Sequence, residues 1–130
     1  MHPLIQKALD QIDATEALVT KHADAIAGIA AVINADEIQA HPTGVCVVAH
    51  LVTDDIDDVR AMAAAITAAG FAEGGRTESC FGDLNMHFSA AAGRFLPTLH
   101  VLLCVREITP GALSETVDGK RTLRGLAAVA

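Results

Sequence analysis

The first quarter of the chain constrains the fold most, because its apolar residues recur with a fixed period of seven. The repeat consists of Ile5, Ile12, Val19, Ile26 and Ile33. A pattern that holds its phase over this length predicts one amphipathic helix, running from Pro3 to about Asn34. Proline is tolerated at the first helical position, and asparagine suits a left-handed residue at a helix C-terminus.

The length of this helix predicts that the chain associates with a second copy of itself. At about 1.5 Å per residue the helix is roughly 48 Å long, whereas a domain of 130 residues has a diameter of roughly 36 Å. The apolar stripe therefore extends beyond its own domain and needs another surface to cover it. The residues expected at this oligomer interface are Ile5, Leu9, Ile12, Val19, Ala23, Ile26, Ala30 and Ile33. A helix break at the capping-box pattern of Asp13 and Glu16 is the alternative.

Composition agrees with association and disfavours two classes of partner. Hydrophobic residues make up 52% of the chain, which is more apolar surface than one small core covers. The net charge of −7 disfavours direct binding to DNA or RNA, because phosphate neutralisation requires clustered lysine and arginine. No apolar run approaches the roughly 18 residues of a membrane span, so we expect no membrane contact.

The N-terminus and the cysteines predict a cytoplasmic location. Met-His-Pro-Leu lacks the basic and apolar regions of a signal peptide. The three cysteines are an odd number, which favours reduced thiols over a disulfide framework.

After the first helix, the pattern predicts a strand followed by a second helix. We expect residues 36–40 to form a short helical turn, and the β-branched run Thr43–Val52 to form a strand. Thr53 or Asp54 caps the next helix, and Gly70 ends it. The buried face of this helix is expected to hold Ile56, Val59, Ala63 and Ile66.

The second half of the chain is expected to contain mainly strands. Residues 72–75 are predicted to be a loop, 76–91 a strand interrupted near Gly82, and 92–94 a hairpin turn. Residues 95–107 are predicted to be a strong strand that closes the hairpin. Residues 108–130 are an ambiguous tail, in which 117–120 could form a tight turn and 123–130 a strand or a docked segment.

These elements predict a single α+β domain spanning residues 1–130. A long oligomerisation helix within residues 1–40 precedes a strand–helix–strand–strand layer at 43–107, and the tail follows. In architecture this layer resembles the ferredoxin-like arrangement, with a mainly antiparallel sheet of three or four strands. Such a likeness carries no function.

The alternation of side chains along the predicted strands separates an apolar face from a polar one. Helices are expected to cover the apolar face, which holds Val45, Val47, Ala49, Leu51, Met86, Phe88, Ala90, Leu99, Val101, Leu103 and Val105. The polar face holds Cys46, Val48, His50, Asn85, His87, Ser89, His100, Leu102, Cys104 and Arg106. We interpret this second face as a semi-polar packing or interface surface.

A zinc site on that face is the alternative, because imidazole and thiolate are the ligands that zinc prefers. Its ligands would come from His50, His87, His100, Cys46 and Cys104. Neighbouring strands lie about 4.8 Å apart, so residues on adjacent strands can share an ion. The paired spacings that make a metal prediction strong are absent.

Three further features suggest a chemical role, and simpler interpretations also apply to them. Asp54 and Asp58 are spaced for one helical face and could ligate Mg²⁺, although capping and the helix dipole explain them. Cys80 and Cys104 are candidate nucleophiles, although inert buried thiols are more common. His22 lies beside the apolar stripe, and its protonation at an interface would oppose association.

The expected function is that of a small acidic homo-oligomeric binding protein without a catalytic site or cofactor. It would act by protein–protein interaction, with itself and with a second protein, as an accessory or inhibitory protein of a mobile element does. The alternatives are a metal- or small-ligand-binding protein or enzyme that uses the polar sheet face, and a structural subunit of a larger assembly.

Overall fold

The computed structural model describes residues 1–78, 82–90 and 98–126. This part of the chain contains three helices and seven strands. In chain order they are α1 (Pro3–Lys21), α2 (Ala23–Ile33), β1 (Glu37–His41), β2 (Gly44–Val52), α3 (Ile56–Ala68), β3 (Phe71–Glu78), β4 (Leu84–Ala90), β5 (Leu99–Arg106), β6 (Ser114–Val117) and β7 (Lys120–Leu123). The fold is α+β, as predicted.

The main sheet is mixed and five-stranded, in the order β1-β2-β5-β4-β3. The central strands β2 and β5 are parallel, and the other neighbouring pairs are antiparallel. The predicted mainly antiparallel sheet of three or four strands is therefore wrong. Two segments without strand patterns in the sequence form the edges: residues 37–41 pair with β2 instead of forming a helical turn, and residues 72–75 belong to β3 instead of a loop.

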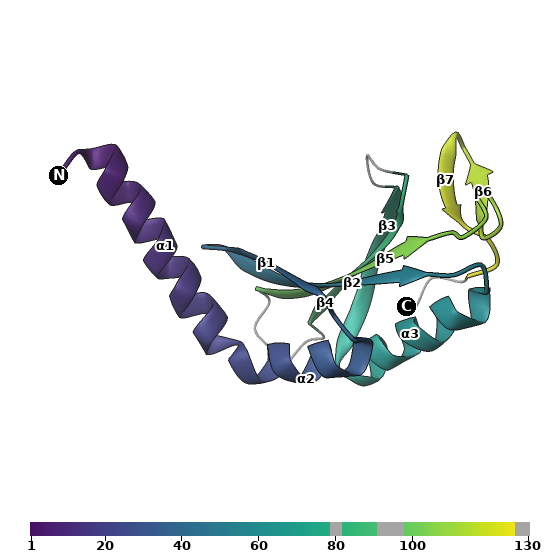
Figure 1. Ribbon diagram of the computed structural model, residues 1–130, viewed down its shortest axis with the longest axis horizontal. Coiled ribbons are helices and arrows are strands. Elements are labelled where there is room, and N and C mark those ends of the chain that lie inside the picture. Colours follow the sequence, from purple (N-terminus) through teal and green to yellow (C-terminus); the bar gives the residue numbers. More distant parts are fainter. Residues whose placement is uncertain (79–81, 91–97, 127–130) are drawn as a thin grey trace.

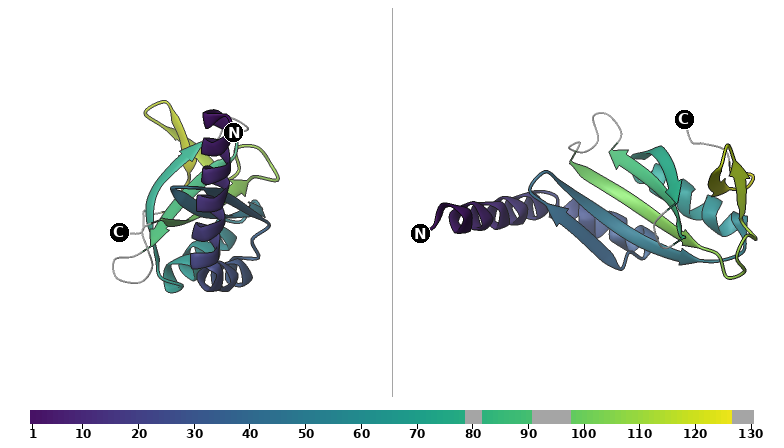
Figure 2. Two further views of the ribbon diagram at one scale, coloured as in Figure 1. Left: turned by 90° about the vertical axis from the view of Figure 1, so that its left-hand side faces the viewer. Right: turned by 90° about the horizontal axis from the view of Figure 1, so that it is seen from above.

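One face of the sheet is covered by α2 and α3, while the other face is open (Figures 1 and 2). The predicted apolar face is the covered one. Its fully buried side chains include Val45, Val47, Met86, Leu99 and Leu103. They form one core with the buried faces of the two helices. The core thus lies between the sheet and α2 and α3, and α1 has no part of the sheet beneath its N-terminal half (Figure 1).

The predicted continuous helix is divided at His22 into α1 and α2. His22 has φ −97° and ψ 5°, which departs from the helical ψ near −42°. Its side chain is 4% exposed, and its Nε2 lies 2.8 Å from Thr98 Oγ1. The direction changes here because α2 must lie along the sheet to bury its isoleucines. Asn34 ends α2 with φ 51°, the left-handed C-cap that the sequence predicts.

Helix α3 follows the prediction closely. Its N-cap is Asp55, whose side chain accepts from the Asp57 N–H, one residue beyond the expected cap. Gly70 follows its C-terminus with φ 107°, and Phe71 behind it is buried. Val59, Ala63 and Ile66 are the buried residues of α3.

The tail contains a β6–β7 hairpin that is fixed to the main sheet by a nearly buried carboxylate. The Glu107 side chain is 2% exposed and pairs with Arg121. Arg121 also donates to the Gly82 carbonyl oxygen. In the described part of the chain, no helix has both the length and the apolar character needed to cross a membrane.

Candidate functional site

Helix α1 extends away from the body of the molecule and buries none of its own residues (Figures 1 and 2). The large apolar side chains of its N-terminal half are exposed: Leu4 by 71%, Ile5 by 54%, Leu9 by 40% and Ile12 by 61%. Ile5, Leu9 and Ile12 share one face at helical spacing. We call Ile5, Leu9 and Ile12 the α1 stripe.

The eight predicted interface residues fall into two groups. Ile5, Leu9 and Ile12 are exposed, and Ala23 is exposed at the start of α2. In contrast, Ile26 and Ile33 are buried in the chain's own core, against which Val19 and Ala30 also pack. The seven-residue pattern therefore serves two surfaces: the second half covers the sheet, and only the first half remains for contact with another molecule.

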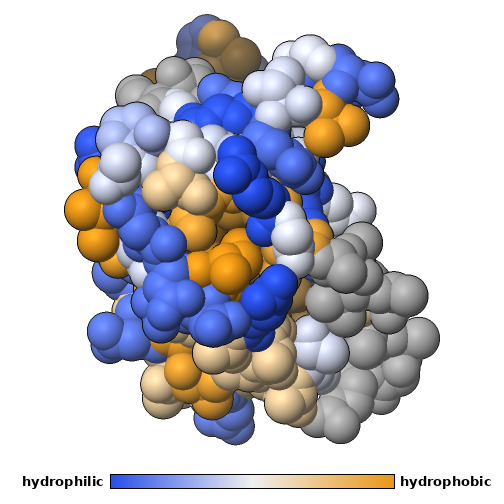
Figure 3. Space-filling model, turned by 90° about the vertical axis from the view of Figure 1, so that its right-hand side faces the viewer, coloured by the Kyte–Doolittle hydropathy of each residue, from blue (hydrophilic) through white to orange (hydrophobic). Residues whose placement is uncertain are grey.

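Other exposed apolar side chains are spread over separate elements. Figure 3 shows the face at the β6–β7 end, where apolar side chains lie in a hollow with polar ones around it. Val52, Ile108 and Val117 are exposed and follow or belong to three different strands. Single exposed apolar residues are normal on soluble proteins, whereas a contiguous group indicates an interaction site. The α1 stripe is such a group, and all of its residues lie on one helix.

A groove lies between the middle of α1 and the C-terminal end of β1 with the turn that follows it. Its volume is about 620 Å³, and it is lined by Ala8, Gln11, Ile12, Thr15, Glu16, Ala40, His41 and Pro42. Ile12 belongs both to the α1 stripe and to this groove, so the two form one continuous surface. The groove could not be predicted from the sequence, because residues 40–42 approach α1 only after β1 has paired with β2.

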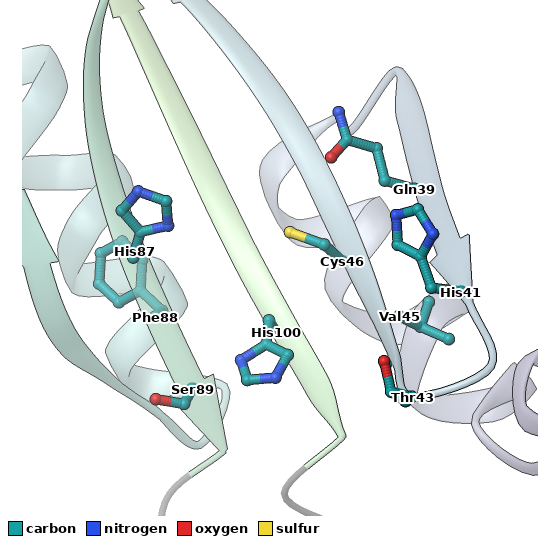
Figure 4. A pocket seen from close by; sticks show the side chains of 10 residues that line it. Gln39, His41, Thr43, Val45, Cys46, His87, Phe88, Ser89 and His100 are labelled. Carbon is teal, nitrogen blue, oxygen red and sulfur yellow. The ribbon is translucent and has the colours of Figure 1, made fainter. Parts of the chain in front are cut away.

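The open face of the sheet carries the predicted histidines and cysteines. A shallow cavity of about 270 Å³ lies there, and side chains from β1, β2, β4 and β5 surround it (Figure 4). Its polar lining side chains are Gln39, His41, Thr43, Cys46, His87, Ser89 and His100. Gln39 and His41 lie on β1, which the sequence did not identify as a strand.

The register sets the neighbours on this face. Cys46 lies opposite His100, and His50 lies opposite Cys104. His50 Nδ1 is 2.9 Å from Asp36 Oδ1, and His87 Nε2 is 3.2 Å from Thr77 Oγ1.

Both described thiols are held in their protonated form. Burial, helped by the charge of Glu37, raises the pKa of Cys46 to about 11. Burial raises the pKa of Cys104 to about 11, and the negative charge of Asp83 makes a smaller contribution in the same direction. A thiol that is protonated at neutral pH is a poor nucleophile. The other candidate nucleophile, Cys80, lies outside the described residues.

The described residues contain no group of three or more His, Cys, Asp or Glu side chains placed to hold a metal ion. The five proposed zinc ligands therefore share a face without converging on one point. The carboxylates of the Asp54–Asp58 cluster have local partners: Asp54 accepts from the Thr109 N–H at 2.8 Å, and Asp58 accepts from the Thr53 hydroxyl at 2.6 Å.

His22 is also placed differently from the expectation. It is buried within its own chain, at the α1–α2 junction, rather than beside a surface for another copy.

Comparison of the chain with models of protein families, with curated proteins and with solved structures finds no match.

Proposed function

We propose that this protein is a homo-oligomeric binding protein that acts through protein–protein contacts rather than through catalysis. The observation that supports this is the projecting helix α1, which buries none of its own residues and exposes the α1 stripe. An isolated helix of about this length is marginal in water. Its apolar face therefore gains most by packing against another protein.

A second copy of the chain is the partner that the stripe fits best. The same stripe is present on every copy, so a two-fold contact covers two exposed surfaces at once. The net charge of −7 leaves the assembled protein acidic, which suits a further partner with a basic surface.

Replacing Ile12 by Glu tests this function. A charge buried at a helix contact is costly, so we expect the oligomer to dissociate to a 13.5 kDa chain. The matched control is Ile108→Glu, since Ile108 is 66% exposed and follows β5. Light scattering after size-exclusion chromatography measures the mass. Equal masses for the two variants would contradict a role for the stripe.

A further inference from the structure

The outer edge of β1 is open to a further strand. β1 lies at one edge of the main sheet (Figures 1 and 2), and all of its residues except Ala40 are exposed. The other edge strand, β3, contacts β7 of the tail hairpin and contains a register shift, and both features protect an edge from further pairing. In contrast, β1 is regular in register and contains neither proline nor lysine.

The hydrogen bonds of β2 show which backbone groups of β1 point outward. Val45 donates its N–H to the Thr98 carbonyl oxygen, so the odd-numbered residues of β2 bond towards β5. The even-numbered residues of β2 therefore bond to β1, and their partners there are its odd-numbered residues. The N–H and C=O groups of Ile38 and Ala40 consequently point away from the sheet. Within the described residues, no hydrogen bond reaches these four groups.

The same edge of a second copy can satisfy all four groups, and it does so in one direction and one register. A two-fold axis along the strands would set each N–H against the identical N–H, whereas an axis perpendicular to the sheet makes the pair antiparallel, so that N–H faces C=O. With this axis at Gln39, Ile38 exchanges both of its backbone hydrogen bonds with the partner's Ala40. Moving the axis to Ala40 pairs Ile38 with Pro42, which has no N–H. Moving it to Ile38 requires the Asp36 N–H, which already bonds to β2.

The side chains on the open face of the sheet are complementary in this register. Gln39 and His41 lie on that face (Figure 4), and Glu37 shares it because side chains alternate along a strand. Glu37 of each copy then lies opposite the partner's His41, and Gln39 lies opposite the partner's Gln39. The carboxylate can accept a hydrogen bond from the imidazole, and the two amides can bond to each other.

On the helix-covered face, the same pair reaches the α1 stripe. Ile38 is exposed in a single copy, and in the pair it lies beside the partner's Ala40. Ala40 lines the groove next to α1 together with Ile12. Cross-strand neighbours have Cβ atoms about 5 Å apart, so Ile38 of one copy borders the groove that holds Ile12 of the other.

We propose that two copies of the chain join their sheets through β1, in an antiparallel pair centred on Gln39. The two main sheets then form one continuous sheet across the two-fold axis. The occupant of the edge is a second copy because β1 is complementary to its own reversed sequence, both in backbone groups and in charge. This inference rests on the proposed homo-oligomer and adds a second surface to its contact.

Cysteine pairing tests the register. Positions 37 and 41 face each other across the axis outside the hydrogen-bonded pairs, where Cα atoms are about 4.5 Å apart, a separation that permits a disulfide. A mixture of Glu37→Cys and His41→Cys chains is therefore expected to form a disulfide-linked dimer under mild oxidation, measured by non-reducing electrophoresis. Each variant alone is expected to form none, because its two cysteines lie about 13 Å apart along the strands.

The wild-type chain controls for the native thiols. A mixture that forms no more linked dimer than the separate variants would overturn the inference.

A charge exchange tests the side-chain pairs without new thiols. His41→Glu places two carboxylates opposite each other in both symmetric pairs, so the dissociation constant should rise about tenfold. Adding Glu37→Lys to the same chain restores opposite charges and should return the constant to the wild-type value. Ile108→Glu, at an exposed position outside β1, should leave it unchanged. A double variant as weak as His41→Glu would count against the pairing.

These results are separable from those that test the proposed function. If Ile12→Glu dissociates the oligomer and the cysteine mixture does not cross-link, the edge inference fails while the proposed function stands. A wild-type chain that is a monomer would remove both.

Discussion

At the scale of single residues, the Glu107 carboxylate makes the electrostatic contacts with the most support in the structure. Its carboxylate accepts from the backbone N–H groups of Gly111 at 2.9 Å and Leu113 at 2.7 Å, and from Arg121. Burial acts to raise the pKa of Glu107, but these hydrogen bonds outweigh it and lower the pKa below its ordinary value of 4.5. The ionised form therefore stabilises the attachment of the tail.

Replacing Glu107 by Gln is expected to destabilise the protein by about 2 kcal/mol at neutral pH. This is less than the roughly 3–5 kcal/mol of a fully buried pair, because Arg121 is 27% exposed. The folded-state pKa is the lower one, so the stabilisation is complete above the unfolded-state pKa and disappears as pH falls through the folded-state value.

Urea unfolding of wild type and Glu107→Gln from about pH 7 to about pH 3 checks this prediction. Circular dichroism is the probe, because the chain has no Trp or Tyr for fluorescence. Glu115→Gln, at an exposed position of β6, is the control. A gap between wild type and Glu107→Gln that persists at the lowest pH would contradict an ionic origin.

The thiols give a second prediction at this scale. With pKa values of about 11 instead of 9.0, Cys46 and Cys104 are expected to be alkylated about 100-fold more slowly at pH 8 than unperturbed thiols, because the thiolate reacts. Mass spectrometry of the modified peptides gives the rate at each cysteine. Rates equal to those of the urea-unfolded chain would show that the thiols are not shielded.

The sequence predicted side-chain direction well within the strands. Alternation assigned Val47 and Val101 to the covered face and His87 and His100 to the open one, because the pleat fixes this period regardless of neighbours. Alternation did not reveal which residues meet across strands. The pairing of Cys46 with His100 depends on the parallel register of β2 and β5, which no local pattern contains.

At the scale of elements, the errors occur where tertiary pairing decides the structure. Residues 37–41 and 71–78 form the two edge strands, and neither has a strong strand pattern. Gly74 and Gly75 in β3 are normally unfavourable in strands, and here they coincide with a register shift between Glu73 and Gly75. Helix α3 was predicted well because its cap, periodicity and terminal glycine are all local signals.

The junction at His22 is another element that local periodicity cannot detect. The apolar period continues unchanged through it, yet the burial of His22 against Thr98 redirects the chain. His22→Ala is expected to cost about 2 kcal/mol, since it leaves the Thr98 hydroxyl without this partner and opens space in the packing. Lys21→Ala, the adjacent exposed residue, should cost little.

The same urea experiment measures this effect. Stability that is equal in His22→Ala and Lys21→Ala would mean that the junction is not held by this histidine.

At the scale of the whole molecule, the sequence predicted an amphipathic helix longer than the body of the domain. In the structure this segment forms two helices, and their apolar residues have different environments. Ile26 and Ile33 complete the chain's own core, and Ile5, Leu9 and Ile12 remain exposed. Amphipathicity alone cannot separate these uses, because a core and an interface select the same residues. Only the position of the sheet relative to each half distinguishes them.

We propose that the α1 stripe is a contact surface between copies of the chain. Sedimentation equilibrium of the full-length wild-type protein, from about 1 to about 100 µM, tests it most directly. We expect a species of 27 kDa, twice the 13.5 kDa of one chain. A mass of 13.5 kDa over the whole range would contradict it.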